Sequence, residues 1–188
     1  MTTILGIDPG LTRLGVGVVK QGGGRTVSLL HVEVLRTPAT SEISHRLGTL
    51  SGAIDELLAR FTPDIVALER VFAQHNVRTV MGTAQVSGVV LALAHSRSIP
   101  VSLRTPSEVK AAVTGHGRAN KHQVGTMVAR ILGLAEIPQP ADAADALALA
   151  ITEAWRGVAP ASAASESTPA QKAWREAEAR AKRPKLQK

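Results

Sequence analysis

The chain has 188 residues, with 22 Lys and Arg against 15 Asp and Glu, which gives a formal charge of +7. It contains no Cys, which excludes disulfides and thiolate metal sites, and no apolar run near the roughly 20 residues that span a bilayer. We therefore expect a cytoplasmic protein outside the membrane, whose excess positive charge favours polyanions such as nucleic acid.

The first segments are rich in β-forming residues. We predict strands at Thr3–Asp8, Leu14–Lys20 and Val27–Leu35, with the glycine-rich stretch 21–24 as a hairpin loop between the second and third. Short loops between successive strands favour antiparallel neighbours. The segment is therefore expected to form a three-stranded antiparallel meander.

Helices and strands then alternate. Apolar residues at helical spacing predict a helix over 43–58 that ends before Thr62, and Asp64–Glu69 has the composition of a buried strand. The remaining expected elements are a helix at Val77–His95, a strand at Val101–Arg104, a short helix opened by Ser107 and Glu108, and helices at Lys121–Leu132 and about Ala141–Trp155. This order implies an α/β fold with a mixed sheet and helices on both faces.

The composition changes after the last predicted helix. Residues 157–171 are mostly Ala, Ser, Pro and Thr, and 157–188 as a whole carry seven basic and three acidic residues. We predict one domain at 1–156, followed by a flexible linker and basic tail at 157–188 that form no core. A solvated tail is the simpler interpretation of its charge, and contact with nucleic acid is the alternative.

Four carboxylates stand where apolar segments end or begin. Asp8 and Glu69 end two predicted strands, while Asp142 and Asp145 open the last helix at a spacing that places both on one face. Two carboxylates about 4 Å apart repel by roughly 4 kcal/mol at an effective dielectric of 20. Two Mg²⁺ ions between four such groups would remove that repulsion, and they could clamp the attacking and leaving oxygens of a phosphodiester hydrolysis.

Each acid also has an ordinary alternative explanation. Asp8 precedes Pro-Gly, which is common turn chemistry, and Glu69 precedes Arg70, with which it could form a surface ion pair. Asp142 and Asp145 suit the first turn of a helix, where acids complement the macrodipole. The combination favours the metal site, because turn and capping needs do not call for acids at all of these places together.

The same motifs resemble a known family. Ile4–Gly10 with Gly15–Gly17, then Ala67–Phe72, then Ala141–Ala148 are similar in order and spacing to the RuvC family of bacterial Holliday-junction resolvases, over about residues 3–155. The resemblance implies an RNase H-like fold with a mixed five-stranded sheet flanked by helices. It also implies a homodimer that nicks two opposed strands of a four-way DNA junction, leaving 5′-phosphate and 3′-hydroxyl ends, in recombination and repair.

The resemblance also assigns cofactors, partners and residues. It implies two Mg²⁺ ions per active site, with Mn²⁺ as a substitute, and the branch-migration proteins RuvA and RuvB as partners. The catalytic and metal-binding residues would be Asp8, Glu69, Asp142 and Asp145, although some family members have His at the position of Asp142. Residues matched to DNA-contacting positions are Phe72, Arg78, Lys110 and Lys121, for which a core role of the Phe and solvated surface charges are the alternatives.

Three other functions remain open. Gly6–Thr12 also looks like the first phosphate loop of actin-like ATPases and sugar kinases, which need two similar lobes around a nucleotide. A related nuclease that processes structured ribosomal RNA shares the acidic residues. A non-catalytic junction-binding protein is the third alternative, and the complete set of acids disfavours it, because those anions would weaken phosphate binding.

Overall fold

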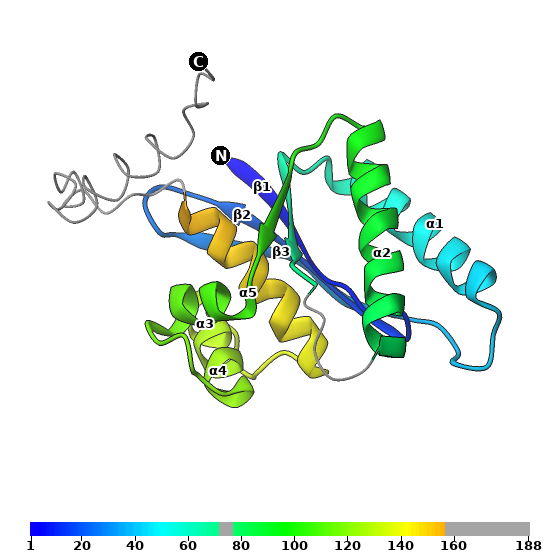
Figure 1. The fold of residues 1–188 in the computed structure, drawn as a ribbon. Helices are drawn as coiled ribbons and strands as arrows, with labels where there is room; N and C mark the ends of the chain where they lie inside the picture. Colours follow the sequence, from blue (N-terminus) through cyan, green and yellow to red (C-terminus); the bar gives the residue numbers. More distant parts are fainter. Residues whose placement is uncertain (72–76, 157–188) are drawn as a thin grey trace, which may run out of the picture. The chain divides into compact units, whose positions relative to one another are not determined.

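The computed structural model describes residues 1–71 and 77–156 of the chain (Figure 1). The elements in chain order are β1 (Thr2–Asp8), β2 (Arg13–Gln21), β3 (Val27–Arg36), α1 (Ile43–Phe61), β4 (Ile65–Glu69), α2 (Val77–Ser96), β5 (Val101–Arg104), α3 (Pro106–Thr114), α4 (Lys121–Leu132) and α5 (Ala141–Arg156). Within the described ranges, every helix is too short or too polar to traverse a lipid bilayer.

The strands form one mixed sheet in the order β3-β2-β1-β4-β5. β1, β2 and β3 pair antiparallel, whereas β4 pairs parallel to β1 and β5 pairs parallel to β4. The predicted meander and the predicted mixed five-stranded sheet are therefore confirmed. The described residues contain this single sheet, and the two similar lobes that an actin-like ATPase needs are not found among them.

Helices cover both faces of the sheet, as predicted. Figure 1 shows α3, α4 and α5 on one side and α1 and α2 on the other. Successive side chains of β1 alternate between two cores: Ile4 packs in the cluster that contains Leu147 of α5, and Leu5 packs in the cluster that contains Ile54 of α1. Both cores are apolar, so burial of this surface on each face of the sheet stabilises the fold.

The last helix, α5, lies unusually close to the sheet. A Cβ atom on Gly15 would overlap the carbonyl oxygen of Asp142, and one on Gly6 would overlap the carbonyl oxygen of Ala146. Glycine in the strands and alanine in the helix thus allow the two backbones to approach each other. This close contact determines where the first turns of α5 stand relative to the ends of β1 and β2.

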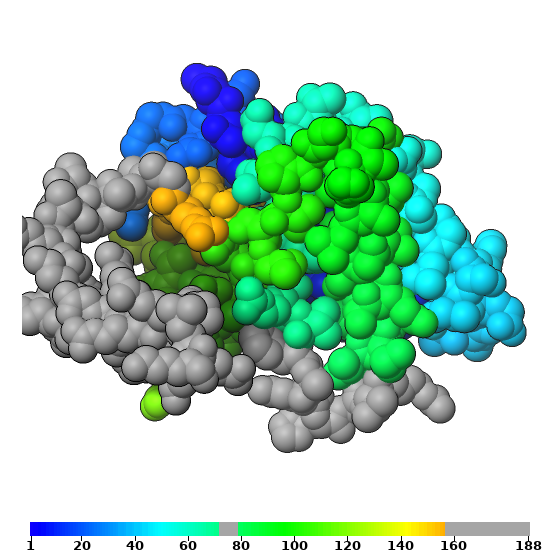
Figure 2. Space-filling model, turned by 45° about the horizontal axis from the view of Figure 1, so that its top comes forward, coloured from blue at the N-terminus to red at the C-terminus, as the bar shows by residue number. Residues whose placement is uncertain are grey.

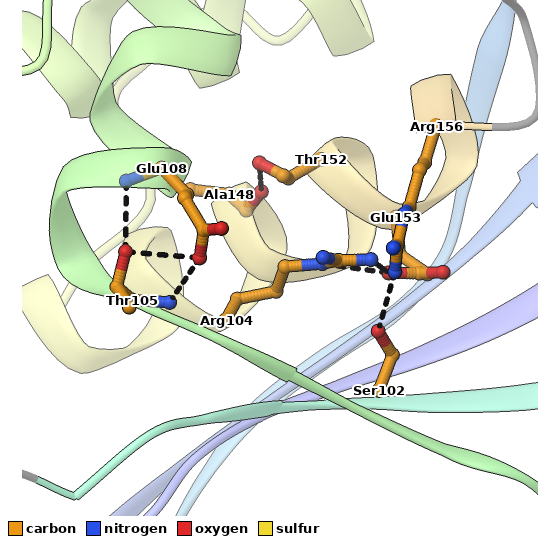
Figure 3. Close-up of polar contacts among 8 residues, drawn as sticks. All are labelled: Ser102, Arg104, Thr105, Glu108, Ala148, Thr152, Glu153 and Arg156. Atoms are coloured by element: carbon orange, nitrogen blue, oxygen red, sulfur yellow. Dashed lines mark hydrogen bonds and ion pairs between the residues drawn. The ribbon is translucent and has the colours of Figure 1, made fainter. Parts of the chain in front are cut away.

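Polar contacts connect β5, α3 and α5 (Figure 3). Arg104 at the end of β5 forms a largely buried ion pair with Glu153 of α5. The predicted start of α3 at Ser107 was wrong: Thr105 is the N-cap, and its side chain accepts a hydrogen bond from the Glu108 amide. Pro106 explains the difference, because proline has no N–H to donate and its fixed φ suits the first helical position.

Candidate metal centre and nucleic-acid interface

Asp8 and Glu69 lie side by side at one edge of the sheet. They are the last residues of β1 and β4, two parallel neighbours in which Ile7 is paired with Leu68. The three residues before each acid, 5–7 and 66–68, are buried, whereas the two acids are only partly buried. The sheet therefore delivers two carboxylates to the same place, at the point where the chain leaves the core.

Asp142 and Asp145 approach this edge from α5. Both belong to its first turns and are partly buried, while Ala143, Ala144 and Ala146 between and beside them are buried. The apolar side of α5 faces the sheet, so the two acids lie along the border between core and solvent. The spacing of three residues places them on neighbouring positions of one helix face, as expected.

A pocket of about 200 Å³ lies between these elements. Its lining residues are Asp8, Glu69, Pro106, Val109, Lys110, Lys121, Val124 and Asp145. Three of the four predicted acids and both predicted lysines therefore share one cavity. Asp142 is not among the lining residues and faces Arg13, whose Nε lies 2.9 Å from Asp142 Oδ2.

The carboxylates of this pocket repel one another, which makes the ionised form of each less favourable. Burial, followed by the negative charges of Glu69, Asp145 and Asp142, raises the pKa of Asp8 to about 7. Burial and the charge of Asp145 likewise raise the pKa of Glu69. Because the neighbouring lysines oppose these shifts only in part, the site holds more negative charge than its own residues neutralise.

Lys121 is the main cation inside the pocket. Its Nζ lies 3.0 Å from Asp145 Oδ2, and this hydrogen bond raises the pKa of Lys121. Asn120 and Gln123 form a capping box that begins α4 at Lys121 and so fixes where the lysine stem leaves the backbone. The Lys121 side chain is 72% exposed, so its ammonium group can also reach a ligand that enters from solvent.

The donor set of the pocket fits hard divalent cations. Such ions take carboxylate oxygens as ligands, and their charge would relieve the repulsion that raises the pKa of Asp8. As placed, no three acidic or histidine side chains among residues 1–71 and 77–156 converge tightly on one point. Arg13 and Lys121 pair with Asp142 and Asp145 through the Oδ2 atom of each carboxylate.

Some of the predicted contact residues lie outside the part of the chain that can be described. Phe72 is beyond the described residues, and so is the side chain of Arg78 at the start of α2. Sequence reasoning missed Arg13, the partner of Asp142. The sequence shows only that Arg13 is a basic residue shortly after Asp8. That position does not reveal a contact with a helix more than a hundred residues later in the chain.

Comparisons with known proteins identify the family of this chain. The family model described as "Crossover junction endodeoxyribonuclease RuvC" matches residues 4–153. A protein of that description from Saccharopolyspora erythraea is 63% identical over 153 residues, which are 81% of this chain and 77% of the relative. One from Leifsonia xyli subsp. xyli is 56% identical over 189 residues, covering 93% of this chain and 91% of the relative.

Solved structures show the same similarity. Thermus thermophilus RuvC in complex with a Holliday junction substrate superposes with a TM-score of 0.80 at 39% identity, covering 84% of this chain and 96% of that one. A second structure of Thermus thermophilus RuvC gives a TM-score of 0.77 at the same identity. The yeast mitochondrial resolvase Ydc2, at 14% identity and a TM-score of 0.60, shares the fold.

Proposed function

Because this chain belongs to the RuvC family of crossover junction endodeoxyribonucleases, we propose that it resolves four-way DNA junctions by hydrolysing one phosphodiester bond in each of two opposed strands. The observation that carries the proposal is that Asp8, Glu69 and Asp145 line one pocket together with Lys110 and Lys121. Acids that hold metal ions beside cations that attract a phosphate are what hydrolysis of a polyanion requires.

The proposed metal ligands are Asp8, Glu69, Asp142 and Asp145, with two Mg²⁺ ions and Mn²⁺ as a substitute. When bound, such ions activate a water molecule and stabilise the departing 3′ oxygen, which leaves a 5′-phosphate and a 3′-hydroxyl. The raised pKa of Asp8 supports this assignment, because it arises from burial and from repulsion by the neighbouring carboxylates, which bound cations would relieve.

The basic residues of the pocket position the substrate in this proposal. Lys110 and Lys121 attract the phosphate backbone, and the exposed ammonium group of Lys121 would donate to a phosphate as well as to Asp145. Phe72 and Arg78 are proposed to contact bases and backbone near the junction centre, as the resemblance to the family implies. Neutralisation of phosphates by such residues releases counterions, so binding should weaken steeply with salt.

We also propose that the protein acts as a homodimer, since one active site per chain must serve two opposed strands. The outer face of α2 supports this: Met81 is 55% exposed and Leu91 is 41% exposed, and Gly88 between them has open space around it. Figure 2 shows α2, in green, in front of α1, in cyan. Two copies of this apolar face packed about a two-fold axis would bury it and match the symmetry of a junction.

Sedimentation velocity tests the dimer. The double substitution Met81→Glu with Leu91→Glu should convert a wild-type dimer into a monomer, because it places charges in the apolar contact. Leu30→Glu is the matched control, since Leu30 is 44% exposed but lies on β3. A double variant that still sediments as a dimer, or a wild-type protein that sediments as a monomer, would contradict this interface.

We further propose that the protein acts together with RuvA and RuvB in the bacterial cytoplasm. This proposal predicts that junction DNA bearing RuvA and RuvB retains more of this protein in a pull-down than the same junction alone. Equal retention would argue that the protein finds junctions without those partners.

One cleavage assay tests the proposed activity as a whole. Purified protein is incubated with a synthetic immobile junction, a plain duplex of the same arms and a structured RNA, each with Mg²⁺ or with a chelator. We expect paired nicks in the junction only, and only with Mg²⁺. Cleavage of the RNA in preference to the junction would favour an RNA-processing nuclease, and tight junction binding without any cleavage would favour a non-catalytic binding protein.

A further inference from the structure

A second cavity lies next to the catalytic pocket. This arginine groove, of about 470 Å³, is lined by Thr12, Arg13, Arg36, Thr37, Pro38 and Ala39. It is bounded by the start of β2, the end of β3 and the segment that leads into α1. Arg13 joins the groove to the catalytic centre, because the same side chain lines the groove and pairs with Asp142.

The two arginines of the groove stand directly opposite each other. Arg13 and Arg36 are register partners in the antiparallel pair of β2 and β3, and both are exposed. Like charges at directly opposed positions of an antiparallel pair destabilise it. An anion bound between them would remove that repulsion, whereas the neighbouring Asp142 compensates one of the two charges at most.

A third arginine lies behind the groove. Arg46 of α1 is only 8% exposed, and it donates from Nε to Thr37 Oγ1 over 2.9 Å and from Nη2 to Thr12 Oγ1 over 2.7 Å. Both of these partners are uncharged hydroxyls. Because an arginine stays protonated even when buried, its charge acts on the groove through a medium that screens less than water does.

The groove also presents hydrogen-bond donors. Thr37 donates its hydroxyl proton to the carbonyl oxygen of Leu11, while Thr12 accepts from Arg46 and keeps its own proton for another acceptor. Arg13 contacts Asp142 through Nε, so its terminal nitrogens have N–H groups for a second acceptor. A tetrahedral oxyanion matches this combination of a hydroxyl and two guanidinium groups.

We propose that the arginine groove binds one phosphate of the DNA backbone, beside the phosphate that enters the catalytic pocket. Arg13 then contacts this phosphate and Asp142 together, and so ties the path of the DNA strand to the position of a metal-ligand carboxylate. This inference rests on the proposed function. A phosphodiester of the same substrate is the appropriate ligand, because Arg13 of the groove pairs with Asp142, which lies three residues before the pocket-lining Asp145 on α5.

The test is the salt dependence of junction binding by the full-length protein with Arg36→Gln. Affinity for a fluorescent immobile junction is measured over a series of KCl concentrations, in Ca²⁺ so that cleavage is suppressed. We expect the slope of log K against log salt to become shallower by about one unit, and Arg36→Lys to restore most of it, because the contact depends on charge. The melting temperature of Arg36→Lys should match the wild type, and that of Arg36→Gln should be no lower, because loss of one charge relieves the repulsion between Arg13 and Arg36.

Arg97→Gln is the matched control. Arg97 is also partly exposed and pairs with Asp55, but it follows the end of α2, away from the edge of the sheet that carries Asp8. Its substitution should leave the slope unchanged. A wild-type slope in Arg36→Gln, in a preparation whose wild type cleaves junctions, would overturn the groove alone. Failure of the wild type to bind junctions would overturn the proposed function and the groove together.

Discussion

Lys121 Nζ lies 3.0 Å from Asp145 Oδ2, so a lysine already occupies a position beside a carboxylate that is proposed to bind metal. If Lys121 also neutralises a DNA phosphate, Lys121→Ala should flatten the salt dependence of junction binding by about one unit, and Lys110→Ala should do the same. Lys20→Ala, on the exposed far end of β2, is the control and should leave the slope unchanged. An unchanged slope in both pocket variants would make these lysines ordinary surface charges.

Removing single acids should separate cleavage from binding. Asp8→Asn, Glu69→Gln and Asp145→Asn should abolish nicking while junction affinity persists, because each removes a metal ligand and leaves the basic residues in place. Asp142→Asn should lose most of its activity but retain some, since Asp142 lies outside the pocket lining. Single-turnover cleavage and a binding assay in Ca²⁺ measure the two effects, and near-normal nicking by Asp8→Asn would refute the metal assignment.

The raised pKa of Asp8 predicts how stability depends on pH. Folding shifts this pKa from 3.8 to about 7, so protonated Asp8 favours the folded state and the benefit disappears as pH rises from about 4 to 7. Without metal, Asp8→Asn should therefore exceed the wild type in unfolding free energy by an amount that grows with pH and levels off above pH 7, at about 4 kcal/mol. Urea unfolding in chelator at pH 5, 6, 7 and 8 measures it, and a difference that is constant with pH would contradict the shift.

Gly15 should be essential for placing the last helix. A side chain at this position would overlap the backbone of Asp142, so Gly15→Ala must displace the start of α5. We expect a loss of about 1–3 kcal/mol of stability. We also expect a fall of about a hundredfold in cleavage rate, because displacements near 1 Å disrupt catalytic geometry. Gly23→Ala is the control, since a Cβ atom there meets open space and both properties should be preserved.

Phe72 follows the strand that presents Glu69 and should contact DNA instead of the core. Phe72→Ala is expected to keep the melting temperature while junction cleavage falls, because loss of stacking on an unpaired base costs about 1–3 kcal/mol. Phe61→Ala, the only other phenylalanine, is the control: Phe61 packs against the core and stacks on His31, so its loss should lower stability. A fall of about 3–5 kcal/mol in stability for Phe72→Ala would instead place it inside.

The elements of the fold were largely predictable, because local patterns determine them. Runs of β-forming residues and a glycine-rich loop indicate the strands, and apolar spacing indicates the helices to within a few residues. Helix α3 begins at Pro106, one residue before the predicted Ser107. The adjacent Thr105-Pro106 pair is the stronger signal, since proline favours the first position of a helix and threonine caps it.

The site was predictable only in part, for a physical reason. That Asp8 and Glu69 end neighbouring strands follows from their local sequences, and the spacing of Asp142 and Asp145 indicates a shared helix face. The pairing of Asp142 with Arg13 depends instead on how closely α5 approaches β2, which is a property of tertiary packing. No local pattern reports which distant carboxylate a given arginine meets.

The position of α5 at the end of the folded domain has a consequence for the cell. A ribosome delivers Asp8 and Glu69 before the two aspartates of α5, so a chain that ends before α5 lacks two of the four proposed metal ligands. Since α5 also packs on β1 and β2 through Gly6 and Gly15, those aspartates come into place only when the sheet is complete. If the four acids bind metal as proposed, a copy that ends before α5 cannot cleave DNA.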